Sequence, residues 1–320
     1  MISLSLERID ATLEANRQKI RKTPALTVPA ELAPTAASVS AKFELHQITG
    51  TFKARAALAN VREQLEAVRK FGVTAVSAGN HAIATAYAAA SVDANAKVVM
   101  TATAPKIRVQ RCEALGAEVV LAPDVHQAFD IMENIVRSEH RTMIHPFEGE
   151  TTALGTAGVG REFALDCPDL DAVIVPIGGG GLAAGVAAAI KQTLPACAVY
   201  GVEPFGADSM SRSRALGEAV TLDSVNTIAD SLGAPMALPI SFDLCQQFVD
   251  DVVCVSDDEL REAMLLQHRY LGLAVEPACA SATAAARGPL AERLQGKHVG
   301  LIFCGSNIDH NAWHRLVSND

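Results

Sequence analysis

The sequence lacks the paired cysteines that metal sites and disulfide frameworks use. It has seven cysteines but no Cys-x-x-Cys pair. Because zinc is usually held by closely spaced ligands, we expect no zinc site. An odd, dispersed set is typical of reduced thiols in a cytoplasmic protein, mostly buried as small apolar side chains. The cysteines stand at positions 112, 167, 197, 245, 254, 279 and 304.

Positive charge is also scarce. Lysine and arginine total 27 against 36 aspartates and glutamates, a formal net charge of −9. This balance argues against partners such as nucleic acid or an anionic membrane surface. The first ten residues carry acids and no secretory apolar core. Residues 172–190 are uncharged, but their proline and central glycines disfavour a membrane helix. We therefore expect a soluble cytoplasmic protein.

Short β-rich runs alternate with helical patterns along nearly the whole chain, without a linker, repeat or low-complexity tract. This alternation predicts an α/β fold with mostly parallel sheets, arranged as two lobes around a cleft. Strands are expected at 38–43, 73–77, 97–101, 118–121, 142–145, 172–176, 199–202, 251–255 and 299–304. Helices are expected between most of these strands, for example at 7–20, 52–69, 81–91, 107–115, 125–138 and 257–270. Ligands in such folds bind at the carboxyl ends of strands, where three conspicuous loops follow, at 77–81, 178–182 and 304–307.

Four consecutive glycines follow one predicted strand and precede an alanine-rich helix. Glycine lets backbone N–H groups approach an anion closely, and the start of a helix adds unpaired donors. The spacing matches neither a P-loop nor the usual dinucleotide fingerprint. We interpret the loop as a phosphate site; a tight turn that binds nothing is the alternative. It comprises Gly178, Gly179, Gly180, Gly181 and the following Leu182.

A lysine stands where a helix is expected to begin, in the segment Thr49-Gly50-Thr51-Phe52-Lys53. The helix dipole disfavours a cation at this end and would lower the pKa of Lys53. An amine of low pKa can form a Schiff base with a carbonyl. Taken alone, Lys53 is more often a solvated surface residue. Together with a phosphate loop, it indicates a cofactor that carries both a carbonyl and a phosphate.

Several motifs occur in the order typical of one enzyme family. They are Thr49-Gly-Thr-Phe-Lys53, Ser77-Ala-Gly-Asn-His81, the glycine loop, Gly201-Val-Glu-Pro204, Glu276-Pro-Ala-Cys-Ala280 and Cys304-Gly-Ser-Asn307. From about residue 21 to 309 the chain resembles the serine/threonine dehydratases, pyridoxal-phosphate (PLP) enzymes of the tryptophan-synthase-β fold (fold type II) related to serine racemase. The resemblance implies a large PLP-binding domain, residues 1–65 and 149–320. It also implies a small domain for the substrate carboxylate, residues 66–148, and a homodimer.

The resemblance also implies roles for individual residues. Lys53 would bind PLP covalently and remove the Cα proton of the substrate. Phe52 would pack against the cofactor ring, and Asn80 would hydrogen-bond its 3-hydroxyl. Residues 178–182 would hold the phosphate through backbone N–H groups. The loop for the substrate carboxylate would comprise Ser77, Ala78, Gly79, Asn80 and His81.

The chain departs from the family pattern at several positions. Cys304 replaces the usual serine or threonine beside the pyridine nitrogen; a neutral thiol there suits β-elimination, and a small core residue is the alternative. Ala56 and Cys279 replace two glycines and are expected to adjust packing. Related enzymes hold a divalent cation near the Gly-Val-Glu-Pro motif. The corresponding residues here are Glu203, Ala207 and Asp208, but Ser209 replaces a common aspartate. A mono- or divalent cation is therefore left open, with a solvated loop as the alternative.

The leading hypothesis is a PLP-dependent dehydratase that converts L-threonine or L-serine to a 2-oxo acid and ammonia. The same reacting atoms occur in 3-hydroxyaspartate, so that substrate stays open. Serine racemase is a second alternative, but racemisation needs a proton donor on the face opposite Lys53, and Ala78 stands where that enzyme has a serine. A silent PLP- or amino-acid-binding protein is the non-enzyme alternative. The chain ends soon after the 304–307 loop, so no appended regulatory domain is expected.

Overall fold

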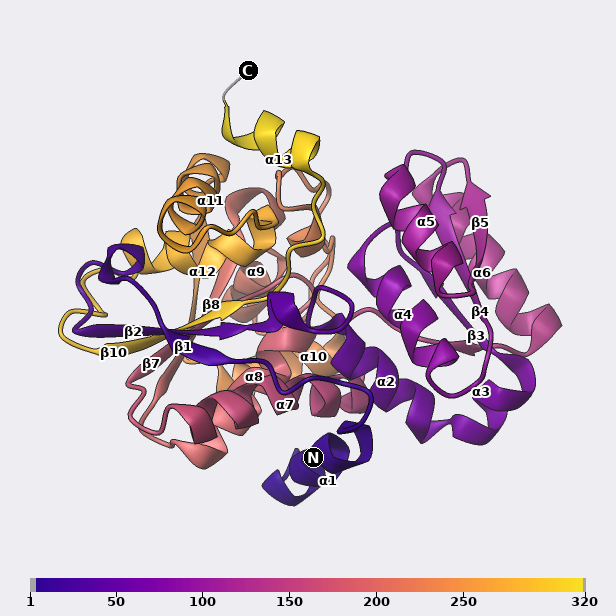
Figure 1. Cartoon of the computed structure of the whole chain (residues 1–320), viewed down its shortest axis with the longest axis horizontal. Helices are drawn as coiled ribbons and strands as arrows, with labels where there is room; N and C mark the ends of the chain where they lie inside the picture. Colours follow the sequence, from indigo (N-terminus) through magenta and orange to yellow (C-terminus); the bar gives the residue numbers. More distant parts are fainter. Residues whose placement is uncertain (1–3, 319–320) are drawn as a thin grey trace.

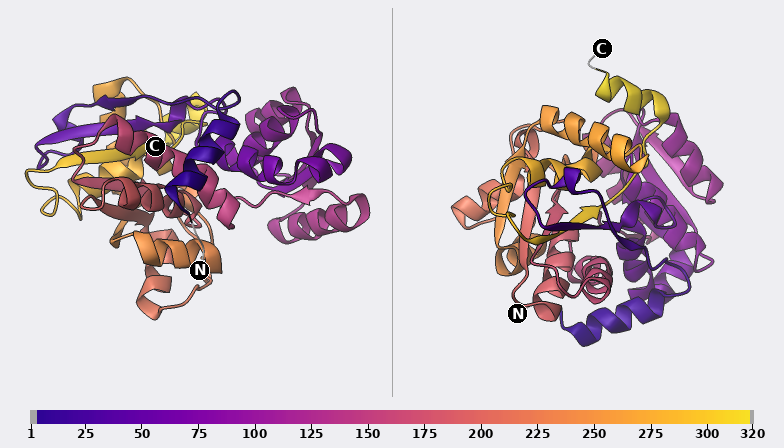
Figure 2. Two further views of the ribbon diagram at one scale, coloured as in Figure 1. Left: turned by 90° about the horizontal axis from the view of Figure 1, so that it is seen from below. Right: turned by 60° about the vertical axis from the view of Figure 1, so that its left-hand side comes forward.

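The computed structural model describes residues 4–318, which form two lobes, each built around its own β-sheet (Figures 1 and 2). The large lobe holds a six-stranded sheet in the order β1 (Ala25–Thr27), β2 (Ser38–Phe43), β10 (His298–Phe303), β7 (Ala172–Pro176), β8 (Ala198–Pro204) and β9 (Asp251–Val255). The small lobe holds a four-stranded sheet in the order β5 (Glu118–Ala122), β4 (Ala96–Thr101), β3 (Val73–Val76) and β6 (Thr142–Met143). Every strand pair is parallel except β1 with β2.

The central strand of the large sheet shows why this sequence forms a parallel sheet. All five residues of β7 are buried, and they pair with β10 on one side and β8 on the other. A strand covered on both faces is continuously apolar rather than alternating, as Ala172-Val-Ile-Val-Pro176 is. Pro176 ends the strand, where its missing N–H removes no further ladder bond. The chain then turns into the glycine loop.

Helices cover both faces of the large sheet (Figure 1). One layer contains α7 (Glu150–Asp166), α8 (Gly181–Thr193) and α10 (Pro239–Phe248); the other contains α11 (Asp257–Leu271) and α12 (Pro277–Arg287). Helices α7 and α8 pack closely because glycines line their contact: a Cβ at Gly160 would lie 2.5 Å from the Val186 carbonyl oxygen. Further helices of this lobe are α1 (Leu6–Asn16), α9 (Ser209–Leu216) and α13 (His310–Val317).

The small lobe contains α3 (Leu65–Phe71), α4 (Asn80–Ala90), α5 (Lys106–Ala114) and α6 (Val125–Glu139). Helix α2 (Lys53–Glu63) connects the lobes: Leu58 and Val61 belong to the small-lobe core, whereas Arg55 reaches large-lobe carboxylates. The fully buried Arg55 guanidinium binds Glu44 and Glu162 at 2.8–2.9 Å. A buried charge needs such pairing, and the pairing fixes α2 against the large sheet.

The α/β fold with two parallel sheets confirms the predicted fold class. The predicted strands all occur, with ends shifted by a few residues, while β1 was not predicted. The helix predicted at 52–69 is two helices, because Gln64 leaves helical geometry with φ −115° and ψ 33°. The division into domains at residues 65 and 148 stays a prediction. Within residues 4–318, no helix is long and apolar enough to cross a membrane.

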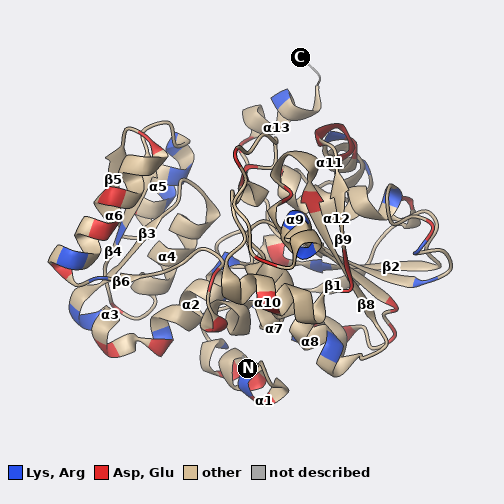
Figure 3. Cartoon of the chain, turned by 180° about the vertical axis from the view of Figure 1, so that it is seen from behind, with Lys and Arg blue, Asp and Glu red and all other residues tan. Residues whose placement is uncertain are grey.

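Acidic and basic positions are mixed along the helices of both lobes in the view of Figure 3.

Candidate active site

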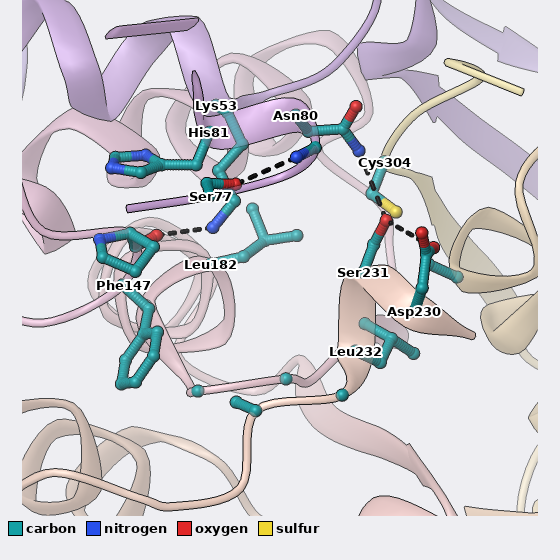
Figure 4. Close-up of a pocket in the computed structure, with 18 of the residues that line it drawn as sticks. Lys53, Ser77, Asn80, His81, Phe147, Leu182, Asp230, Ser231, Leu232 and Cys304 are labelled. Carbon is teal, nitrogen blue, oxygen red and sulfur yellow. Dashed lines mark hydrogen bonds between the residues drawn. The ribbon is translucent and has the colours of Figure 1, made fainter. Parts of the chain in front are cut away.

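A cavity of about 340 Å³ lies between the lobes, at the carboxyl ends of β3, β7 and β10 (Figure 4). The loops after these strands all reach it: residues 77–81 after β3, residues 178–182 after β7 and Cys304 after β10. These are the loops that the sequence singled out. Every residue predicted to bind the cofactor or the substrate lines this cavity, whereas the predicted cation residues do not.

Lys53 is the first residue of α2, as predicted, and its amine projects into the cavity (Figure 4). Its Nζ donates to the Pro146 carbonyl oxygen at 2.5 Å and lies 5.1 Å from the centroid of the Phe52 ring. Burial lowers the pKa of Lys53 from 10.5 to about 8, opposed by the nearby Cys304 and Glu276. The predicted direction was correct, but burial is the main cause. The fraction of this amine that is unprotonated near neutral pH is therefore larger than at its ordinary pKa, and the unprotonated amine can act as a nucleophile or base.

The glycine loop leads from β7 into α8 and presents the start of that helix to the cavity. Gly180 has φ +93°, a left-handed conformation that other residues adopt at a cost. Gly179 lies against the Phe147 ring, so that a Cβ there would be 2.2 Å from Phe147 Cγ. The first N–H groups of a helix have no partner within the helix, and its dipole favours an anion there. Loop and helix together have the geometry expected of a phosphate site, and phosphate binding by this loop stays a prediction.

The 77–81 loop leads into α4, whose first turn also faces the cavity. Ser77 Oγ accepts from the Gly79 N–H at 3.1 Å and shapes the turn. The His81 ring is buried and its Nε2 lies 2.8 Å from the Ile144 carbonyl oxygen, so the imidazole is used within the small lobe. Burial lowers the pKa of His81 to about 3, which keeps the ring neutral. The unpaired backbone N–H groups at the start of α4, rather than the His81 side chain, are thus suited to hold a carboxylate.

The Asn80 side chain makes contacts that the sequence did not predict. Its Nδ2 donates to both oxygens of Glu276, at 3.0 and 2.9 Å. Glu276 is buried and also accepts from Ser231 Oγ at 2.7 Å. Both partners line the cavity. Glu276 lay within a recognised motif without a role, and Ser231 lies in a 3₁₀ turn, η4 (Asp230–Leu232), that no pattern marked.

A second contact across the cavity joins Arg108 of α5 to Asp230 of η4. Arg108 Nη1 donates to Asp230 Oδ2 at 2.9 Å. Both residues line the cavity, and the pair links the small lobe to the large one at its edge. No local sequence pattern indicates this pair, because its members are 122 positions apart.

Cys304 lines the cavity near Lys53, and the backbone N–H of Phe52 donates to its carbonyl oxygen at 3.2 Å. A hydrogen bond with the Cys279 thiol and burial raise the pKa of Cys304 well above its ordinary value. The thiol is therefore neutral, as the prediction requires. Cys279, expected only to adjust packing, is a direct partner of Cys304.

We expect Cys304→Ser to be tolerated and Cys304→Asp to be damaging. A hydroxyl keeps a neutral hydrogen-bonding group beside the predicted position of the ring nitrogen. A carboxylate there would favour protonation of that nitrogen. The serine variant should keep turnover within about threefold, while the aspartate variant should lose on the order of 10²-fold. Steady-state rates and absorbance spectra of both variants check this. A dead serine variant beside a fully active aspartate variant would contradict the assignment.

The residues proposed for a cation are engaged in other contacts. The Glu203 side chain is fully buried, and its carboxylate accepts from the N–H groups of Met210 and Ser211 at 2.9 and 2.8 Å, capping α9. The alternative of a solvated loop is thus wrong for Glu203. Asp208 is paired with Arg212 at 2.9 Å, and Ala207 is buried beside it. These contacts offer little support for a cation there, and its binding stays an untested prediction.

The expectation of no zinc site overlooked one His-x-x-x-His spacing, His310 to His314, on α13. Their ring centroids lie 6.4 Å apart. Among residues 4–318, no group of three or more His, Cys, Asp or Glu side chains is arranged to hold a metal ion.

The donor set of the cavity fits PLP. Lys53 offers an amine of lowered pKa for the carbonyl, the glycine loop and α8 offer N–H groups for the phosphate, and Asn80 offers an amide for the phenolic oxygen. Cys304 offers a neutral thiol for the ring nitrogen. When bound, PLP withdraws electrons from the substrate Cα. The protein positions the reacting atoms and moves the protons.

Comparisons with known proteins identify the family of this chain. Residues 17–305 match the family described as pyridoxal-phosphate dependent enzyme. The chain is 50% identical over 299 residues to the phenylserine dehydratase of Ralstonia pickettii, covering 93% of this chain and 92% of that one. It is 33% identical over 285 residues to the L-threonine ammonia-lyase of Thermotoga maritima, covering 89% and 71%. Among solved structures, maize serine racemase superposes with a TM-score of 0.91 at 29% identity, covering 98% and 97%. The resemblance inferred from the motifs is confirmed: this chain belongs to the pyridoxal-phosphate-dependent enzymes of fold type II.

Proposed function

We propose that this protein is a PLP-dependent dehydratase that converts an L-3-hydroxy amino acid to a 2-oxo acid and ammonia. The observation that carries the proposal is the buried Lys53 amine, with a pKa near 8, in the same cavity as an anion-binding loop. A silent binding protein would not need an amine held in this state. The names of two relatives, a phenylserine dehydratase and an L-threonine ammonia-lyase, add support.

In this proposal, the start of α4 binds the substrate carboxylate and Lys53 removes the proton from Cα. The 3-hydroxyl group leaves as water after it gains a proton, and the resulting enamine hydrolyses to the 2-oxo acid and ammonia. One base on one face is sufficient for elimination.

The cavity favours a substrate with an uncharged side chain. Leu182, Leu232 and Ala234 provide apolar lining. Among the described residues that line the cavity, the lysine and arginine side chains are Lys53 and Arg108, and Arg108 is already paired with Asp230. A second substrate carboxylate would meet no unpaired cation apart from the catalytic amine, which argues against 3-hydroxyaspartate. We propose L-threonine, L-serine or an aryl analogue such as phenylserine.

We also propose that the enzyme is a cytoplasmic homodimer. The large domain would comprise residues 1–65 and 149–320, and the small domain residues 66–148. The separate sheets of the two lobes support this division.

Serine racemase is the second candidate, favoured by the solved structure with a TM-score of 0.91. Racemisation needs a proton donor opposite Lys53, and Ala78 in the 77–81 loop provides none. We expect L-serine or L-threonine to give 2-oxo acid with little D-amino acid. Ala78→Ser should raise the ratio of racemisation to elimination by about tenfold or more. Chiral chromatography of the reaction mixture, together with an ammonia assay, measures both products.

Ala78→Gly is the matched control, since it changes the same position without adding a hydroxyl. Abundant D-serine from the unmodified enzyme would contradict the single-base proposal and favour the racemase.

A further inference from the structure

A chain of hydrogen bonds crosses between the lobes behind the cavity. Arg111 of α5 donates to Asn307 Oδ1, and Asn307 Nδ2 donates to Asn80 Oδ1 at 2.8 Å. Asn80 Nδ2 donates to Glu276, as described above. Arg111 and Asn80 belong to small-lobe helices, whereas Asn307 and Glu276 belong to the large lobe. This series of hydrogen bonds therefore passes from lobe to lobe three times.

The first residue of this series of hydrogen bonds can only donate, and the last can only accept. The Arg111 guanidinium has donors and no acceptor, and the Glu276 carboxylate has acceptors and no donor when ionised. The two asparagines between them could each be rotated by 180° about the amide. A rotated Asn307 would place its NH₂ against Arg111, and a rotated Asn80 would place its carbonyl oxygen against the Glu276 carboxylate. Opposing donors or opposing acceptors are unfavourable, so the two ends determine both amide orientations.

Further hydrogen bonds of Arg111, Asn307 and Glu276 also favour these amide orientations. Asn307 Nδ2 also donates to the Thr49 carbonyl oxygen at 2.9 Å, and Arg111 Nη2 donates to the same oxygen at 3.2 Å. Glu276 accepts the Asn307 backbone N–H at 3.0 Å and the Ser231 hydroxyl at 2.7 Å. Its carboxylate is buried with three donor groups around it, which satisfies the charge.

We propose that Arg111, Asn307 and Glu276 are positioning residues that fix the amide of Asn80, so that it meets the cofactor as a hydrogen-bond donor. One hydrogen of Asn80 Nδ2 is directed to Glu276. The other has only a long contact, 3.4 Å to Ser231 Oγ, and is available at the cavity wall. The phenolic oxygen of PLP needs a donor, which an amide rotated by 180° would not supply. Arg111 does not line the cavity, so it acts through Asn307 and Asn80.

A double-mutant cycle on the PLP-loaded protein tests this inference. Arg111→Met removes the donor end of the chain and keeps the length of the side chain; Arg111→Lys keeps a donor and is the matched control. The measured quantities are the dissociation constant of PLP and the pH at which its visible absorbance changes. We expect Arg111→Met to weaken PLP binding about threefold to tenfold and to shift the absorbance transition, the size of effect of one hydrogen bond. Arg111→Lys should remain within about twofold.

The decisive comparison is the same substitution in an Asn80→Ala background. If Arg111 acts through Asn80, Arg111→Met has no further effect there. An equal effect in both backgrounds, or no effect of Arg111→Met on PLP binding and absorbance, would overturn the inference. If Arg111→Met fails to fold, Asn307→Leu replaces it, because Asn307 is the next residue in the series of hydrogen bonds. Its effect on PLP binding is then compared with and without Asn80→Ala. Because the readout is cofactor binding, the result is independent of the substrate that the enzyme uses.

Discussion

Lys53→Ala is expected to abolish turnover and the visible absorbance of lysine-bound PLP. Lys53 provides the amine that lines the cavity, and it is also the proposed base. Removing both functions should lower kcat by at least about 10³-fold. Steady-state assays and absorbance spectra after reconstitution with PLP measure the two effects. A variant that kept the spectrum and near-normal activity would place the cofactor lysine elsewhere.

Lys53→Arg is the matched control, because it preserves a long cationic side chain that does not condense with a carbonyl. It should fold like the unmodified protein and stay inactive.

The unmodified protein adds a pH test. With a pKa of about 8, the fraction of unprotonated Lys53 rises as the pH passes upward through that value. The rate at which the cofactor-free, unmodified protein captures PLP should therefore increase from pH 7 to pH 9. A rate that does not change over this range would contradict the prediction.

Gly179→Val is expected to weaken PLP binding severely. The sequence argument was that any Cβ in the loop would obstruct the phosphate. The structure gives a different reason: the new Cβ would lie 2.2 Å from Phe147 Cγ, so the loop or the ring must move. Displacing the loop removes N–H contacts to the phosphate. Loss of two charge-assisted hydrogen bonds would raise the dissociation constant of PLP by on the order of 10²-fold or more.

A compensating change separates this effect from unfolding. Phe147→Ala removes the ring against which the Cβ would collide, so Gly179→Ala combined with Phe147→Ala should recover part of the PLP affinity that Gly179→Ala alone loses. Fluorescence titration with PLP and thermal denaturation measure affinity and folding separately. Unchanged affinity in a folded Gly179→Val protein would contradict the phosphate assignment.

The fold could be predicted because its strands are strongly apolar and regularly separated. The β7 segment, residues 172–176, was located to the residue, and the glycines after it marked the anion site. The break at Gln64 was not predictable, since a glutamine favours a helix and the break depends on how α2 and α3 pack. Helix α7 was not named from the sequence because its glycines weaken the helical pattern. Gly160 serves its contact with α8, whereas Gly155 and Gly158 lie against α2 and α1.

The candidate site could be predicted where the residue type and its immediate neighbours in the sequence are enough to indicate the chemistry. Lys53 and the glycine loop are of this kind. Glu276, Ser231 and Asn307 act through partners far away in the sequence: Asn80 and Glu276, for example, are 196 positions apart. No local pattern indicates such a contact. Cys279 was noticed only as a departure from a motif, and its contact with Cys304 depends on how α12 packs beside β10.

The most direct test of the proposed function is the yield of 2-oxo acid and ammonia from a panel of L-3-hydroxy amino acids. The panel contains serine, threonine, phenylserine and 3-hydroxyaspartate, each incubated with PLP-saturated enzyme and with Lys53→Ala. We predict equimolar 2-oxo acid and ammonia from at least one of the three substrates with an uncharged side chain, and none from the variant. Absence of both products from all four substrates, or their equal formation by Lys53→Ala, would contradict the proposal.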